Sequence, residues 1–107
     1  MNLFDLVPVR TAGWEEDDAG RVVIHAPRGR LLTFFSRLFG KEEHVRLRLD
    51  EEGSFVWKRC DGQRTAGEIV DEACRERGEE TASFARRTAS FLRDLKKNRL
   101  IRFEETP

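Results

Sequence analysis

Residues 45–49, with the sequence VRLRL, constrain this chain more than any other segment. Three apolar side chains share one face, those of Val45, Leu47 and Leu49, and the other face carries Arg46 and Arg48. This period-two alternation is typical of a β-strand that buries one face. Arginines on the open face also discourage unwanted pairing with other strand edges. The sequence therefore predicts a half-buried strand that needs a core on one side only.

Three helices are predicted after this strand, and a short extended segment follows them. Each helix has a side-chain cap at its start, and one of these is a capping box, Thr65-Ala66-Gly67-Glu68. Each helix also has a residue at its end that stops or breaks it. The expected boundaries are Asp50 to Asp61-Gly62, Thr65 to Gly78, Thr81 or Ser83 to Asn98, and an extended segment over 100–103.

The part before residue 45 predicts two more strands. Residues 7–14 form the first, with Gly13 as a bulge, and residues 21–26, RVVIHA, form the second after an acidic turn over 15–20. Residues 30–39 have helical apolar spacing and are expected to cover the sheet, associate with a second copy, dock on a partner or touch a membrane. The prediction is one α+β domain over 1–107: a three-stranded antiparallel meander, three helices and a short terminal wing.

Composition excludes several classes of protein. The 20 basic and 20 acidic residues cancel, so net charge gives no pull toward nucleic acid or acidic membranes. Eight phenylalanines and two tryptophans favour a packed fold over disorder. The first ten residues lack the pattern of a signal peptide, and no apolar stretch approaches the ~20 residues of a membrane span. We expect a cytoplasmic protein in which Cys60 and Cys74 are reduced.

Residues with catalytic or metal-binding spacing are missing. His25 and His44 have no ligand-spaced neighbours, and the two cysteines form no CxxC pattern. Gly29 and Gly40 lie too far apart for a phosphate-binding loop, and no serine lies in a nucleophile elbow. We therefore expect no enzyme activity, no catalytic residues, no metal and no cofactor.

The ordered combination of signals over residues 47–103 resembles the PqqD-like family. The matching stretches are LRLDEEGSFVWKRCDGQRTAGEIVDEA and FLRDLKKNRLIRF. They contain, in order, a strand ending in Leu-Asp, a helix with an aromatic residue near its end, an Asp-Gly break, a Thr-capped helix and a Phe-Leu-x-x-Leu helix. Residues 45–103 form the family-like part, and residues 1–44 are a divergent N-terminal part.

The resemblance implies a winged-helix-like fold and a non-catalytic role. Members capture the leader of a ribosomally made precursor peptide and present it to a modifying enzyme, often of the radical-SAM type. The leader adds as an extended strand to the edge of the third strand, here 45–49, against the third helix. The peptide-binding residues expected from this are Val45, Arg46, Leu47, Arg48, Leu49, Phe84, Arg87, Thr88 and Phe91.

Several alternatives stay open at this stage. Arg46 and Arg48 either attract acidic leader residues or form only a solvated strand face, and the same holds for Arg86 and Arg87. One competing class is an interaction module in which the peptide groove is vestigial. The other is a winged-helix DNA-binding regulator, because residues 86–102 carry many basic side chains. The neutral net charge speaks against that class, so we expect no nucleic acid and no membrane as partners. A homodimer, including a swapped one, is left open.

Overall fold

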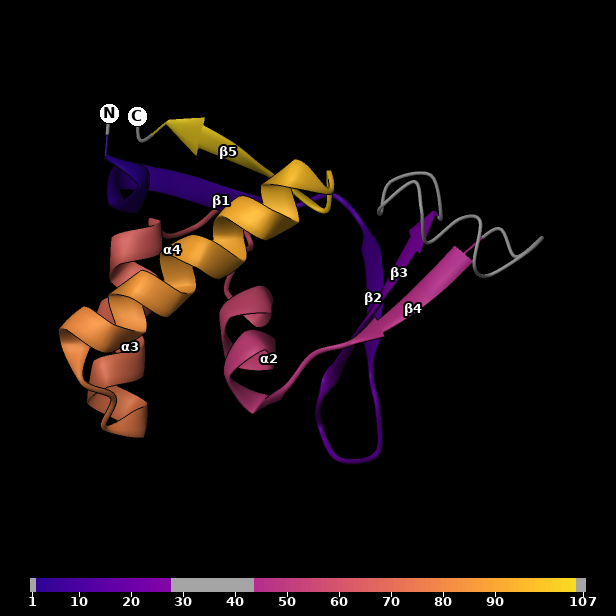
Figure 1. Cartoon of the computed structure of the whole chain (residues 1–107), viewed down its shortest axis with the longest axis horizontal. Helices are drawn as coiled ribbons and strands as arrows, with labels where there is room; N and C mark the ends of the chain where they lie inside the picture. Colours follow the sequence, from indigo (N-terminus) through magenta and orange to yellow (C-terminus); the bar gives the residue numbers. More distant parts are fainter. Residues whose placement is uncertain (1, 28–43, 106–107) are drawn as a thin grey trace.

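The computed structural model describes residues 2–27 and 44–105, and Figure 1 shows the arrangement of their helices and strands. A 3-10 turn, η1 (Leu3–Asp5), precedes the first strand. The strands and helices, in chain order, are β1 (Leu6–Arg10), β2 (Gly13–Glu16), β3 (Val22–Pro27), β4 (His44–Arg48), α2 (Glu51–Lys58), α3 (Ala66–Arg77), α4 (Thr81–Lys97) and β5 (Ile101–Glu105). The amphipathic segment predicted over 30–39 lies outside the described residues.

The expected three-stranded antiparallel sheet is present, in the order β2-β3-β4. Ile24 pairs with Trp14 on one side and with Leu47 on the other, so side chains of these three residues share one face. α2 packs against β3, and the α+β prediction with three helices and a terminal strand is confirmed.

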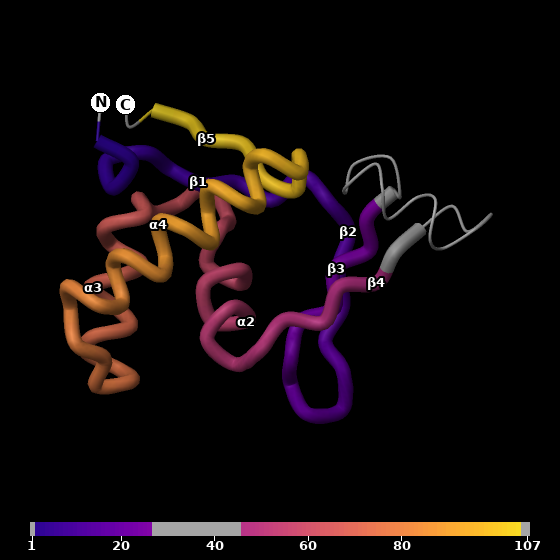
Figure 2. The backbone as a smooth tube through the Cα atoms, viewed as in Figure 1, coloured from indigo at the N-terminus to yellow at the C-terminus, as the bar shows by residue number. Residues whose placement is uncertain are grey.

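The first predicted strand, over 7–14, is two strands that belong to different sheets. β1 pairs with β5 from the other end of the chain, whereas β2 pairs with β3. The change of sheet occurs between them, where the Arg10 and Thr11 N–H groups donate to the carbonyls of Cys60 and Leu100. In Figure 2 the tube passes here from the upper pair of strands to the sheet on the right. An alternating pattern alone cannot reveal this change, because both strands have the same period.

The core lies between the inner face of the sheet and the three helices. Val22, Ile24 and Ala26 of β3 have no exposed surface, and neither has Trp57 of α2, which is therefore a packing residue of the core. The Ser54 hydroxyl of α2 accepts a hydrogen bond of 2.9 Å from the Val22 N–H and thereby fixes the helix to the strand. The first half of α2 is thereby held against β3, close to the end of β4.

The helix boundaries follow the predicted caps closely. The Asp50 carboxylate accepts from the Gly53 N–H at 2.7 Å, Thr65 and Glu68 form the capping box, and Gly78 ends α3 with φ 69°. The cap of α4 is Glu80, one residue before the predicted start, and its carboxylate accepts from two backbone N–H groups of the first turn. Among the described residues, no helix combines the length and apolar character that crossing a membrane requires.

Candidate functional site

The outer edge of β4 offers backbone hydrogen-bonding groups. In the sheet β4 pairs with β3 alone, so among the described residues no strand lies along its other side. The Leu49 N–H donates to the Val22 carbonyl at 2.8 Å, and alternate residues of an antiparallel ladder face the partner strand. Leu47 therefore turns its backbone toward β3, whereas Arg46 and Arg48 turn theirs outward. The edge can accept an added strand at these two residues.

The open face of the sheet carries charges that pair with one another. Arg46 Nη2 lies 2.7 Å from Glu15 Oε1, and Arg48 Nε lies 2.5 Å from Asp17 Oδ2. Asp17 also accepts from the backbone N–H of Arg21, and this bond, followed by the one from Arg48, holds the pKa of the Asp17 carboxyl below its ordinary value. Both arginines thus have acidic partners within the chain, and more than half of each side chain stays exposed.

The helix-facing side of β4 borders a groove that reaches α4. Leu47, Leu49 and Phe91 are partly buried and pack against the core. A methyl group added at Gly53 would lie 3.4 Å from Leu49 Cβ and 3.5 Å from Phe91 Cζ. The end of β4 and the middle of α4 therefore approach one another across the first turn of α2, where the missing side chain of Gly53 leaves space.

A small cavity lies in this groove between α2 and α4. Its volume is about 110 Å³, less than half of the ~300 Å³ at which small-molecule pockets begin. The residues that line it come from both helices and from the cap of α2, and they are Asp50, Glu52, Gly53, Val56, Arg87, Thr88 and Phe91. A cavity of this size can take one side chain, not a separate metabolite.

Arg87 is held at the mouth of the cavity by two acidic residues. Its Nε and Nη2 donate to both carboxylate oxygens of Glu52 at 2.9–3.1 Å, and Nη2 also lies 3.2 Å from Glu79. The Ser83 hydroxyl accepts from Nη1 at 2.6 Å. The hydrogen bond to Glu52 is the main reason that the pKa of Arg87 lies above its ordinary value. The positive charge of Arg87 is therefore matched within the chain.

Two of the expected site residues on α4 are buried. Phe84 has no exposed surface, so it supports the groove from the core and offers no surface to a ligand. Thr88 is 2% exposed and lines the cavity, and its Oγ1 has no hydrogen-bond partner among the described residues. For β4, the structure describes the backbone of Val45 but not its side chain. Of the expected residues, Arg87, Thr88 and Phe91 line the cavity, whereas residues 46–49 do not; Leu49 lies beside it, next to Gly53.

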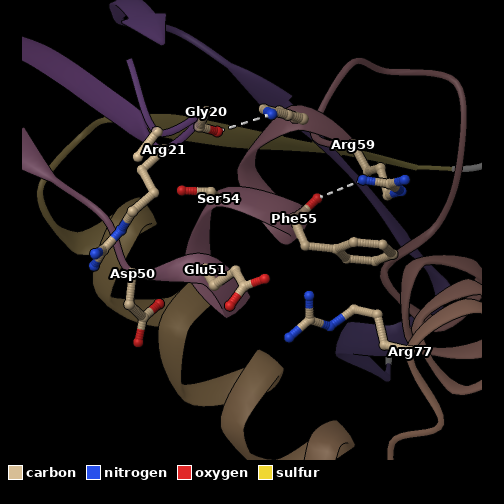
Figure 3. Close-up of a pocket in the computed structure, with 10 residues that line it drawn as sticks. Gly20, Arg21, Asp50, Glu51, Ser54, Phe55, Arg59 and Arg77 are labelled. Atoms are coloured by element: carbon tan, nitrogen blue, oxygen red, sulfur yellow. Dashed lines mark hydrogen bonds between the residues drawn. The ribbon is translucent and has the colours of Figure 1, made fainter. Parts of the chain in front are cut away.

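A wider hollow of about 850 Å³ lies on the other flank of α2 (Figure 3). Arg59 stacks on the ring of Phe55 with its guanidinium carbon 3.5 Å from the ring centre, and Arg77 lies 5.5 Å from the same ring. Lys58 bonds to Glu16 and to the Gly20 carbonyl, each at 3.2 Å. The basic side chains of this hollow are therefore largely engaged in bracing α2 against its neighbours.

Groups with metal-binding or nucleophilic geometry are not found in the described part of the chain. No cluster of three histidine, cysteine or acidic side chains there could hold a metal ion. Cys60 is fully buried, and burial raises the pKa of its thiol to about 12. Such a thiol stays protonated near neutral pH and behaves as a small apolar side chain.

The comparisons with known proteins agree with this geometry. A family model described as Coenzyme PQQ synthesis protein D (PqqD) matches residues 37–101. The chain belongs to the PqqD family. No curated protein and no solved structure matches it. The matched range includes β4, all three helices and the cavity between α2 and α4, so every residue of the groove lies inside the PqqD match.

Membership in the PqqD family gives the general role. The family is one of non-catalytic recognition elements that bind precursor peptides and work with the enzymes that modify ribosomally made peptides. The sequence analysis did not single out the α2 side of the groove, formed by Asp50, Glu52, Gly53 and Val56. The available signal was Gly53 itself, because a glycine inside a helix lowers helix stability and often marks a close approach of two elements.

Proposed function

We propose that this protein captures the leader segment of a ribosomally made precursor peptide at the outer edge of β4 and presents it to a modifying enzyme of the radical-SAM type. The observation that carries the proposal is the outer edge of β4, along which no strand of the described residues lies, beside the groove. Arg46 and Arg48 direct backbone groups outward, and the cavity between α2 and α4 begins where β4 ends.

Strand addition accounts for the affinity that such an edge can supply. An extended peptide bonds to the outward N–H and C=O groups, and main-chain bonds make little demand on its sequence. Alternate side chains of the added strand point to opposite faces of the sheet. One set then lies over the charged face with Arg46 and Arg48, and the other set enters the groove beside Leu47, Leu49 and Phe91.

The charges on the open face favour acidic residues among the leader side chains that lie over it. Arg46 is paired with Glu15 at a largely exposed site, and exposed ion pairs contribute little because water screens them. A leader carboxylate can therefore exchange with Glu15 at low cost. The arginines then serve register and association rate more than affinity.

A titration followed by NMR tests the proposal. The protein is ¹⁵N-labelled, and a candidate leader is added, taken from a short reading frame beside the gene. We expect saturable shifts at the amides of Arg46, Arg48 and Gly53. The amides of Arg102 and Glu104 in β5, which belongs to the other sheet, are the internal control and should shift least.

N-methylation of the bound peptide, one amide at a time, then tests strand addition directly. Amides that bond to β4 alternate along the added strand, so every second methylation should weaken binding about threefold to tenfold and the others should not. Uniform losses would refute strand addition. Salt-sensitive shifts with duplex DNA along α4, and none with peptides, would refute peptide capture and favour the DNA-binding alternative.

A further inference from the structure

We infer that the cavity between α2 and α4 is a specificity pocket for one leader side chain that is small and carries a hydrogen-bond donor, such as serine, threonine or asparagine. The inference rests on the proposed function, because it concerns the side chains of the same bound strand. A pocket of this kind prefers a polar side chain, whereas a purely apolar pocket would prefer a hydrocarbon side chain and a basic pocket a carboxylate. The polar residues that line the cavity distinguish these three cases.

The hydroxyl of Thr88 favours a polar atom in the bound side chain. Thr88 is 2% exposed and lines the cavity, and its Oγ1 has no hydrogen-bond partner among the described residues. Buried hydroxyls in folded proteins nearly always have a partner. Threonine in a helix populates two χ1 rotamers, so a change of rotamer can direct this hydroxyl to a group in the cavity. A bound side chain with a polar atom supplies the missing partner.

The charge around the cavity also restricts which side chain can bind there. The charged groups that line it are Asp50, Glu52 and Arg87, which give an excess of one negative charge. Arg87 bonds to two carboxylates, those of Glu52 and Glu79, so a leader carboxylate would have to displace both, whereas at Arg46 it would displace one. Only one carboxylate oxygen of Asp50 bonds to its helix, at the Gly53 N–H. The cavity therefore favours a donor over an anion.

The volume of the cavity limits the size of the bound side chain. The volume of about 110 Å³ corresponds to between three and four water molecules at roughly 30 Å³ each. A side chain of three or four non-hydrogen atoms fits this space, whereas an aromatic ring does not. Val56 and Phe91 form apolar walls that fit the carbon atoms of such a side chain. Gly53 contributes because any larger residue at its position would narrow the same space.

Selection from a peptide library provides the test, with random dodecapeptides displayed on their mRNA as the probe. One selection uses the wild-type protein, and a second uses Thr88→Val, which keeps the shape of the side chain and removes the hydroxyl. Thr88→Ser, which keeps the hydroxyl, is the matched control. NMR shifts at Arg48 and Gly53 show which selected peptides bind at the groove.

The expected result is one peptide position enriched in serine, threonine or asparagine with the wild type. That preference should change to small apolar residues with Thr88→Val. The best wild-type peptide should bind Thr88→Val about threefold to tenfold more weakly and Thr88→Ser nearly unchanged. Peptides that bind at β4 with the same apolar preference for both proteins would overturn the pocket assignment and leave strand addition intact. Failure to select any peptide that shifts β4 amides would overturn the proposed function and the pocket together.

Discussion

Replacement of Thr88 by valine should stabilise the peptide-free protein. The hydroxyl of Thr88 is buried without a partner, and an unsatisfied buried polar group costs about 1–3 kcal/mol. Valine has nearly the same shape, and its helix propensity is close to that of threonine. We therefore expect Thr88→Val to raise the free energy of unfolding by about 1–2 kcal/mol, which corresponds to roughly 4–8 °C in Tm per kcal/mol for a domain of this size.

Urea unfolding followed by tryptophan fluorescence measures this change, because Trp57 is fully buried and reports the loss of the core. Thr88→Ser is the control. It keeps the hydroxyl and removes a buried methyl group, so it should lower the free energy of unfolding by about 1 kcal/mol. If Thr88→Val proves less stable than the wild type, the hydroxyl has a partner in solution, such as the Phe84 carbonyl one turn earlier or a bound water. Thr88 would then need no partner from a bound side chain, and the donor-binding role of the cavity would lose the support of this hydroxyl.

Other substitutions test the groove and the buried thiol. Gly53→Ala places a methyl group 3.0 Å from Asp50 Oδ1 and narrows the cavity, so peptide affinity measured by calorimetry should fall several-fold; Gly13→Ala, whose methyl group has no atom within 4 Å, should leave it unchanged. Iodoacetamide at pH 8 should label the partly exposed Cys74 and spare Cys60 in the folded protein, since a thiol with a pKa of about 12 is only about 10⁻⁴ ionised at that pH; equal labelling of both, read by mass spectrometry, would contradict the burial of Cys60. Folding raises the pKa of Cys60 from 9.0 to about 12, so the contribution of the protonated thiol to the free energy of unfolding is complete below pH 9 and is lost as pH rises toward 12. By pH 10.5 the free energy of unfolding of the wild type should therefore have fallen by about 2 kcal/mol more than that of Cys60→Ala, as measured by urea titration.

Local signals in the sequence were enough to predict most of the fold. The alternation of 45–49 gave β4, and the caps at Asp50, Thr65 and Gly78 gave the helix boundaries, because each of these depends on residues that are neighbours in the chain. The division of 7–14 into two strands could not be predicted. It depends on β5, whose pairing with β1 joins opposite ends of the chain and leaves no mark on the local pattern.

The candidate site was predictable only in part, for a related reason. Helical spacing places Phe84, Thr88 and Phe91 on one stripe of α4, and the structure confirms that all three face inward to some degree. Their depth differs, because α2 and the end of β4 cover the stripe unevenly. Phe84 is completely buried, whereas Phe91 remains partly exposed beside Gly53. A periodic pattern gives the direction of a side chain but not what lies above it.

The pairing of β1 with β5 has a consequence for how the chain acquires its structure. β1 is synthesised before its partner β5, and the other described strands and helices lie between them, so this two-stranded sheet cannot close before synthesis of β5 is complete. Contacts between such distant segments form late, because the entropy cost of closing a long loop comes before the stabilisation that the contacts supply. The groove between β4, α2 and α4 uses segments that lie closer together and can form earlier. Packing of α2 against α4 therefore does not have to wait for β1 and β5 to pair.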